Sequence, residues 1–185
     1  LVEELVPGKL SLGVVTRTLQ NLLQESVPIR DMRTVVEALT EVSGRTQDPD
    51  QLAQLVRPKL GRMIVQGLLE NRDTLSVMTL DPHLEQLLHN VLQQNNGSPG
   101  MVLEPSLAES LFAALRESAR NTEEQGFAAV LVVSPAIRPW MSKAVRFRVS
   151  DLTVLSYSEI PDDQPVKVIH TVQADPRNNP TVNKA

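Results

Sequence analysis

The sequence lacks cysteine altogether and contains few aromatic residues: one Trp, one Tyr and three Phe among 185 residues. The absence of cysteine excludes disulfide bonds, thiolate zinc sites and cysteine nucleophiles. The aromatic residues are too few for a surface that stacks nucleic-acid bases. A formal net charge of −4 and a pI of about 5.4 also argue against a nucleic-acid binder, which normally carries a basic excess.

Long apolar runs are absent as well. No window of the sequence approaches the roughly 20 apolar residues that a membrane-spanning helix needs, and no signal peptide is found. The chain opens "LVEELVPGKL" without an initiator Met, which suggests a piece of a longer protein. Its hydrophobic content of 41% is enough for a packed core, so we expect one medium domain or two small ones.

The sequence also has no strong motif for catalysis or cofactor binding. His83 and His89 are six residues apart, on roughly opposite sides of a helix, and His170 lies in a strand without a nearby carboxylate, so no metal site is predicted. No phosphate-binding glycine loop and no G-x-S-x-G elbow occurs. We therefore expect no catalytic residue, no cofactor and no metal.

Ser134 is the one exception that we consider. In "VVSPAIRP" it ends a buried strand ahead of a helix, which is a position where an anion can bind. A plain helix cap explains the same residues. The alternative function that follows from Ser134 is a small α/β ligand-binding or enzymatic domain.

Residues 1–72 are predicted to form an all-α helical subdomain. Ser11 is the expected N-cap of a first helix, and a tight break at Ser26–Pro28 separates it from a second helix whose opening turn contains Pro28. In this second helix the apolar residues recur at steps of three and four and predict one buried stripe. The residues of that stripe are Ile29, Met32, Val35, Val36 and Leu39.

A third helical pattern covers residues 50–71 and starts at Asp48–Pro49. Pro58 interrupts this pattern, because proline lacks the N–H that an α-helix needs and its ring clashes with the preceding turn. We expect a kink or a split of this helix near Arg57.

Residues 73–173 are predicted to form a small α/β subdomain with a partly parallel sheet, and residues 174–185 a flexible tail. The element order is β-α-α-β-α-β-β, in which the helices start at Asp81–Pro82, at Glu104–Pro105 and near Pro139. The strands are expected at 74–80, 128–134, 152–157 and 166–172. The fold class is thus mixed α and β.

The second helix raises a question about its outer face, which carries four charged residues: Arg30, Asp31, Arg33 and Glu37. Arg33 and Glu37 are four residues apart and are expected to pair on the helix surface. By itself the pattern is that of an amphipathic helix with a solvated outer face. A role in holding a partner requires further information.

That information comes from a resemblance. The stretch 4–41, with its run "LQNLLQESVPIRDMRTVVEAL", resembles the cytoplasmic region of flagellar type III export gate proteins, the FHIPEP family. Three later stretches resemble the final subdomain of that family in the same order: "GMVLEPSLAESLF", "VLVVSPAIRPWMSKAVRF" and "LTVLSYSEIPDDQPVKVIHTV". The resemblance covers residues 1 to about 173. Export gates of virulence injectisomes share the architecture and are the alternative, although their helical segment usually reads less like "VPIRDMRT".

The resemblance implies a parent protein in the bacterial inner membrane, with four subdomains in its cytoplasmic portion. This chain would hold the end of the second subdomain, the third and the fourth. In the family, nine cytoplasmic portions form a ring below the export channel. The ring docks export chaperones with their substrates and contacts other components of the apparatus. The chain would thus lie at the cytoplasmic face of the inner membrane and would not be an enzyme.

The resemblance also implies roles for particular residues. Arg30, Asp31, Arg33 and Glu37 would either pair across a boundary between ring subunits or brace the next subdomain of the same chain. The family's chaperone site lies between the first and second subdomains, so only its final wall would be present, near Val6, Leu12 and Gly13. We therefore expect this chain to bind chaperones weakly or not at all.

Overall fold

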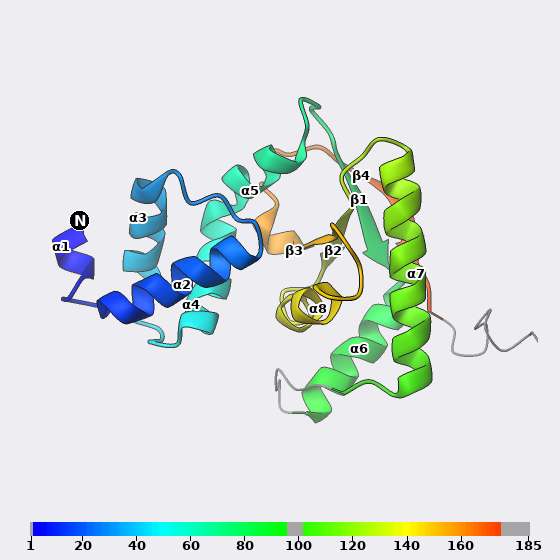
Figure 1. Cartoon of the computed structure of the whole chain (residues 1–185), viewed down its shortest axis with the longest axis horizontal. Helices are drawn as coiled ribbons and strands as arrows, with labels where there is room; N and C mark the ends of the chain where they lie inside the picture. The colour runs from blue at the N-terminus through cyan, green and yellow to red at the C-terminus, as the bar shows by residue number, and fades with distance from the viewer. Residues whose placement is uncertain (1, 96–101, 175–185) are drawn as a thin grey trace, which may run out of the picture. The chain divides into compact units, whose positions relative to one another are not determined.

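The computed structural model describes residues 2–95 and 102–174 and divides them into two compact units (Figure 1). Residues 2–71 and 158–163 form the helical unit, and residues 72–157 and 164–174 form the α/β unit. The predicted class, a helical part followed by a mixed α/β part, is confirmed. The inclusion of residues 158–163 in the helical unit was not expected from the sequence. Within the described ranges, no helix is both long and apolar enough to cross a membrane.

The helical unit consists of short helices: α1 (Val2–Leu5), α2 (Leu12–Gln24), α3 (Met32–Val42), α4 (Pro49–Val56), the 3-10 helix η1 (Arg57–Leu60) and α5 (Gly61–Leu68). α2 and α3 pack against α4, and α1 packs against α3. The predicted split near Arg57 is confirmed, because α4 gives way to the 3-10 turn that contains Pro58 and the α-helix resumes at Gly61.

The break after α2 is confirmed, and it is a Schellman motif. Ser26 adopts a φ of +57°, and its N–H donates to the carbonyl of Leu23 at 2.9 Å. The N–H of Val27 donates to the carbonyl of Leu22 at 3.0 Å, and the Val27 side chain is buried. These two bonds satisfy the last carbonyls of α2 and turn the chain away from the helix axis.

The prediction that Pro28 occupies the opening turn of the next helix is wrong. Residues 27–31 are not helical, and α3 begins at Met32. The reason is local: the Asp31 side chain accepts a hydrogen bond from the N–H of Thr34 and so fixes the N-cap at position 31. Ile29 therefore lies outside the helix, and Met32 is 41% exposed rather than part of the buried stripe.

The α/β unit contains β1 (Leu75–Leu80), α6 (Pro82–Gln94), α7 (Pro105–Glu124), β2 (Val130–Val133), α8 (Arg138–Val145), β3 (Thr153–Ser156) and β4 (Val166–Val172). A 3-10 turn, η2 (Tyr157–Glu159), follows β3, and its last two residues belong to the helical unit. The predicted element order is confirmed. The strand order in the sheet is β3-β2-β1-β4, and every pairing is parallel, whereas we expected a partly parallel sheet. The pairing of β1 with β4 shifts register between Val77 and Met78. β2 is buried along its whole length, as its continuous apolar sequence indicates.

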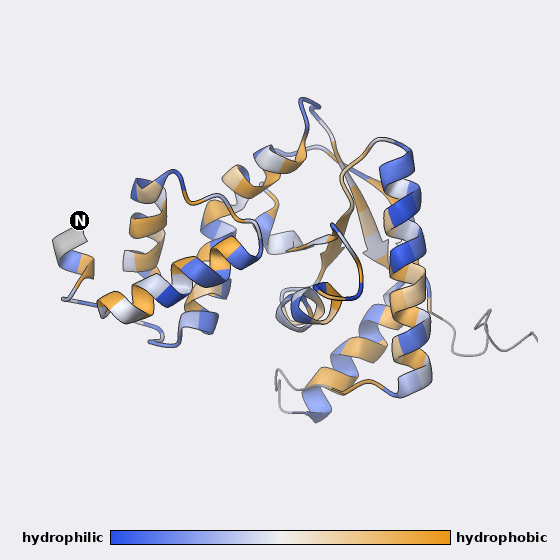
Figure 2. Ribbon diagram, viewed as in Figure 1, coloured by the Kyte–Doolittle hydropathy of each residue, from blue (hydrophilic) through white to orange (hydrophobic). Residues whose placement is uncertain are grey.

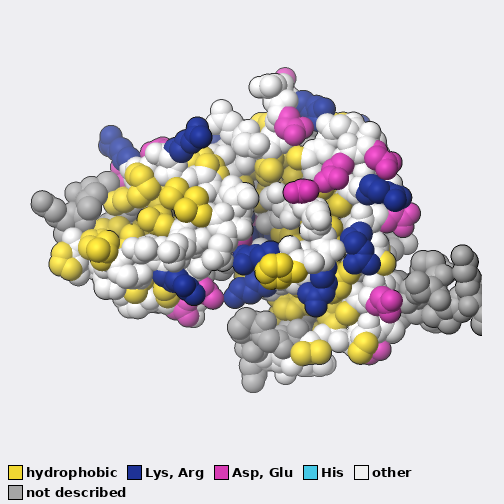
Figure 3. All heavy atoms as spheres, viewed as in Figure 1, with side chains coloured by type: hydrophobic (Ala, Val, Ile, Leu, Met, Phe, Trp, Pro, Cys, Tyr) yellow, Lys and Arg dark blue, Asp and Glu magenta, His cyan; other side chains and the backbone are white. Residues whose placement is uncertain are grey.

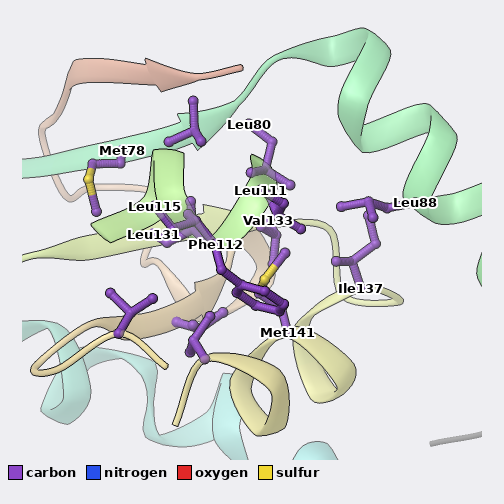
Figure 4. Close-up of a cluster of buried hydrophobic side chains, with 14 of the residues drawn as sticks. Met78, Leu80, Leu88, Leu111, Phe112, Leu115, Leu131, Val133, Ile137 and Met141 are labelled. Carbon is purple, nitrogen blue, oxygen red and sulfur yellow. The ribbon is translucent and has the colours of Figure 1, made fainter. Parts of the chain in front are cut away.

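The core of the α/β unit lies where α6, α7 and α8 meet the sheet (Figure 4). Its largest fully buried side chains include Met78, Leu88, Leu111 and Leu115. Hydrophobic and hydrophilic residues alternate along the helices in Figure 2, as expected of helices that pack one side on a core. The helical unit has its own buried set: Leu5, Leu10, Val15, Leu22, Val27, Val35, Val36, Leu39, Val42, Leu52, Val56, Leu60, Ile64 and Val65.

Candidate protein-interaction site

The predicted charged face lies at the start of α3 and is exposed. Arg30, Asp31, Arg33 and Glu37 all lie at the surface of the helical unit. The predicted pair is confirmed: Nε of Arg33 donates to Oε1 of Glu37 at 3.0 Å. This hydrogen bond, together with the nearby carboxylate charge, raises the pKa of Arg33. The face therefore presents an ion pair on the first turns of α3 and a further exposed cation, Arg30, in the segment just before the helix.

Asp31 has a structural role that the other three residues lack. Its Oδ1 accepts from the N–H of Thr34 at 3.1 Å, and its Oδ2 accepts from the Thr34 hydroxyl at 2.6 Å. These bonds stabilise the carboxylate, and the pKa of Asp31 is lowered mainly by the hydroxyl bond and then by the backbone bond. Asp31 is thus committed to the N-cap of α3.

The lowered pKa gives a pH-dependent prediction. A depressed carboxyl pKa means that the N-cap stabilises the folded state above the ordinary aspartate pKa of about 3.9, and that this stabilisation is lost as the pH falls through the lower folded value. We expect the titration midpoint of the Asp31 carboxyl, measured by NMR, to lie below 3.9. Asp31→Asn should keep the cap but remove this contribution to the acid sensitivity of α3 in hydrogen exchange.

The matched control for this prediction is Asp162→Asn, which removes an exposed carboxylate that caps no helix. It should leave the acid sensitivity of the α3 amides unchanged. An Asp31 midpoint at or above the ordinary value would contradict the proposed cap.

Exposed apolar side chains accompany the charged face. Leu12 and Leu23 of α2 are 68% and 52% exposed, which is unusual for large aliphatic residues. Figure 3 shows hydrophobic side chains gathered on the viewed face of the helical unit, in the region of α2 and α3. Exposed apolar surface next to charged residues is typical of protein-interaction sites.

Of the residues proposed for the final wall of a chaperone site, two begin α2 and one lies in the turn that follows α1. Leu12 is the first residue of α2, Gly13 follows it at the surface, and Val6 is half-buried in the preceding turn. Leu12 is the member of this set with the largest exposed side chain. These residues offer an exposed apolar end of a helix.

Sequence reasoning missed a buried ionic cluster in the helical unit. Arg57 is 2% exposed, and its guanidinium donates from Nε to Oε1 of Glu159 and from a terminal nitrogen to Oε2 of Glu25, both at 2.6 Å. Glu159 is 1% exposed and Glu25 14% exposed. Glu159 lies 102 residues along the chain from Arg57, so this contact holds residues 158–163 against η1.

Gly61 makes the approach of that segment possible. A Cβ atom on Gly61 would lie 2.0 Å from the carbonyl oxygen of Glu159, far inside van der Waals contact. Only glycine allows the backbone of residues 158–163 to come this close to α5. An exposed pair between Arg62 and Asp163, at 3.1 Å, adds a second contact beside it.

The Ser134 alternative loses its anion-binding position. The N–H of Ser134, at the end of β2, donates to Oε1 of Glu85 at 2.7 Å, so a carboxylate of the chain already occupies the place of an anion. The hydroxyl of Ser134 is buried and has no hydrogen-bond partner among the described residues. Within the described residues no group of three His, Cys, Asp or Glu side chains is arranged to hold a metal ion.

Comparisons with known proteins agree on one family. The FHIPEP family model matches residues 1–165. The flagellar biosynthesis protein FlhA of Escherichia coli (strain K12) is 41% identical over 172 residues, which are 93% of this chain and 24% of that protein. FlhA of Bacillus subtilis (strain 168) is 30% identical over 172 residues, 93% of this chain and 25% of that protein. The chain thus spans about a quarter of the length of these relatives.

Solved structures show the same fold. The CdsV protein of Chlamydia pneumoniae superposes with a TM-score of 0.78 at 25% identity, covering 89% of this chain and 47% of that one. The nonameric EscV cytosolic domain of a type III secretion system superposes with a TM-score of 0.71 at 27% identity, covering 94% of this chain and 50% of that one. The resemblance seen in the sequence is therefore confirmed, and the chain belongs to the FHIPEP family.

Proposed function

We propose that this chain is a non-enzymatic assembly module in the cytoplasmic portion of a flagellar type III export gate. The observation that carries the proposal is the match to FlhA proteins over 93% of the chain at up to 41% identity. The structural relatives from type III secretion systems are more distant, at 24–28% identity, which favours the flagellar branch over an injectisome. The parent protein would lie in the inner membrane, with this module on its cytoplasmic face.

The charged face of α3 is our proposed contact between ring subunits. A ring with head-to-tail contacts needs two different complementary patches on each subunit, and the exposed residues Arg30, Arg33 and Glu37 supply one patch of mixed charge. Ion pairs at the rim of such an interface fix orientation more than affinity. A nonameric assembly of the structurally related EscV domain supports self-association as the role of this fold. The alternative role of these charged residues is to brace the next subdomain of the same chain.

Charge reversal in the intact cytoplasmic portion tests this proposal. We expect Arg30→Glu together with Arg33→Glu to weaken ring assembly about tenfold. The two new carboxylates would repel the acidic groups of the neighbouring subunit that the two cations are proposed to contact. Mass photometry or light scattering over a concentration series measures the shift from rings to monomers. Asp31 is left unchanged because reversing its charge, to Arg or Lys, would remove the side chain that caps α3.

Two controls separate a subunit contact from a local effect. Arg17→Glu reverses an exposed charge on α2 and should leave assembly unchanged. The double variant Arg33→Glu, Glu37→Arg keeps an ion pair within α3 but exchanges the positions of the two charges. If the pair acts only within its own helix, this variant should form rings as the unmodified protein does. If the pair contacts a neighbouring subunit, this variant should form rings less well. Normal rings in the Arg30→Glu, Arg33→Glu protein would remove the proposed role.

The partners of the parent protein follow from the same family. We propose that the ring receives export chaperones with their substrates and contacts other parts of the apparatus. A solved complex of CdsV with CdsO supports contacts of this fold with a further protein. The apolar end of α2 around Leu12 is the part of a chaperone site that this chain contributes, and on its own it offers too little surface for tight binding.

A further inference from the structure

The α/β unit has a groove between α7 and α8 that the proposed ring contact does not use. Its volume is about 420 Å³, within the range of sites that accept large side chains or small ligands. The residues that line it are Val102, Leu103, Ala108, Phe112, Trp140, Lys143, Ala144 and Arg148. Leu103, Phe112 and Trp140 are almost fully buried and form an apolar floor.

The rim of this groove is cationic. Lys143 and Arg148 line it with exposed side chains, and Arg146 is exposed on the same turn of chain. The guanidinium of Arg148 lies 4.8 Å from the ring centroid of Phe112 and donates to the carbonyl of Ala144 at 2.9 Å, which holds the charge over the apolar floor. In Figure 3, Lys and Arg side chains gather around hydrophobic ones in the region of α8.

Two apolar residues of this part of the chain are strongly exposed: Val102, which lines the groove, and Phe147, the sequence neighbour of the lining residue Arg148. Phe147, between Arg146 and Arg148, is 89% exposed, and Val102 is 82% exposed. The position of Lys143 has a local explanation, because a cation in the last turn of α8 interacts favourably with the negative end of the helix dipole. This interaction does not explain why the aromatic side chain of Phe147, which precedes the groove residue Arg148 in the sequence, is exposed to solvent. Aromatic and Arg side chains of this kind are the residues that most often dominate protein interfaces.

We propose that this groove docks an acidic amphipathic helix of a partner protein, which inserts an apolar side chain over Phe112 and Trp140 and places carboxylates against Lys143 and Arg148. The cationic rim formed by Lys143 and Arg148 complements the carboxylates of such a helix, on a chain whose formal net charge is −4. The concave apolar floor favours a helix with a protruding anchor over a flat membrane surface. This inference concerns the α/β unit alone and does not depend on ring assembly.

The groove contains its own reporter, because Trp140 is the single tryptophan of the chain. The test titrates the full chain with a fluorescein-labelled 18-residue model helix without tryptophan, in which Leu and Phe form one stripe and Glu flanks it. A scrambled peptide of equal composition and a Lys-for-Glu peptide serve as controls. We expect the acidic amphipathic peptide to bind, to change the Trp140 emission, and to bind at least tenfold more tightly than either control.

Variants of the groove then decide the site. Arg148→Glu and Lys143→Glu should each weaken binding about tenfold, and Ala144→Leu, which fills the groove without changing charge, should weaken it as well. Arg116→Glu, an exposed charge on α7 outside the groove, should have no effect. Near-ultraviolet circular dichroism of each variant shows that the fold is kept.

Three outcomes would overturn the proposal: absence of binding, equal binding of the scrambled peptide, and binding that survives Arg148→Glu and Lys143→Glu. A preference for anionic phosphatidylserine vesicles over the peptide would also overturn it, because the surface would then be a membrane contact. Self-association of the chain that is lost in the same variants, without peptide binding, would assign the groove to a second copy instead.

Discussion

Replacing Arg57 by alanine is expected to destabilise the helical unit by about 3–5 kcal/mol, because it removes the guanidinium that two carboxylates share in a buried place. Glu159 and Glu25 would keep their negative charges close together, with Glu159 only 1% exposed and Glu25 14% exposed. Native-state hydrogen exchange of the α4 and α5 amides measures this effect directly. Tryptophan fluorescence would not, because Trp140 lies in the α/β unit.

Arg62→Ala is the matched control for this experiment. Arg62 also pairs with the segment 158–163, through Asp163, but the two side chains are 74% and 68% exposed. Surface pairs contribute only about 0–1 kcal/mol, since water screens the charges. Equal effects of Arg57→Ala and Arg62→Ala would contradict the structural importance that we assign to the buried cluster. Glu159→Gln combined with Arg57→Met should recover part of the lost stability, because it removes charge from both positions.

Gly61→Ala is expected to have the second large effect, with a loss of at least 1–3 kcal/mol, the usual cost of overpacking. The added methyl group would lie 2.0 Å from the carbonyl oxygen of Glu159 and 2.9 Å from its carbonyl carbon. Backbone atoms cannot turn aside as a flexible side chain does, so residues 158–163 must move away from α5. We expect faster hydrogen exchange in both segments and a lower melting temperature.

Gly67→Ala supplies a control of opposite sign in the same helix. No atom lies within 4 Å of a Cβ placed at Gly67, so alanine fits without strain. Because alanine favours the helix over glycine, this variant should stabilise the chain by up to about 1 kcal/mol. A stabilising effect of Gly61→Ala would show that residues 158–163 do not approach α5 in solution.

The sequence predicted those parts of the fold that local chemistry determines. The helix starts at Asp48–Pro49, Asp81–Pro82 and Glu104–Pro105 are confirmed because each acidic side chain caps the N–H groups that follow it. The split at Pro58 is confirmed because proline cannot continue the α-helix. The order of the strands along the chain is confirmed as well. The wrong start of α3 arose from two competing local signals, Pro28 and Asp31, of which the hydrogen-bonding cap decided the boundary.

The contacts that the sequence did not reveal are long-range. The pairing of Arg57 with Glu159 joins positions 102 residues apart, and no local pattern encodes it. Two signals were nevertheless present. Arg57 follows Ala53 by four residues on the buried side of the third helical pattern, and Gly61 lies inside that pattern, where alanine would be the better helix former. A charged residue on the buried side of a helix indicates a buried counter-charge, and a glycine there indicates that another segment of backbone packs closely against it.

For the candidate interaction site, the sequence predicted one local contact and missed another, and the interface role of these residues stays a prediction. It predicted the pairing of Arg33 with Glu37 correctly, since this contact spans one helical turn. It grouped Asp31 with them, although the structure uses Asp31 as a cap. The groove between α7 and α8 was missed because its lining comes from three separate stretches around Leu103, Phe112 and Trp140, which only the tertiary fold brings together.

The assignment of residues 158–163 to the helical unit means that the polypeptide passes between the two units at three places: 71/72, 157/158 and 163/164. A fragment that ends at residue 71 would therefore lack Glu159, the buried carboxylate that pairs with Arg57 in the helical unit. The two units of this chain are therefore best expressed together, because the loop between β3 and β4 contributes residues 158–163 to the helical unit.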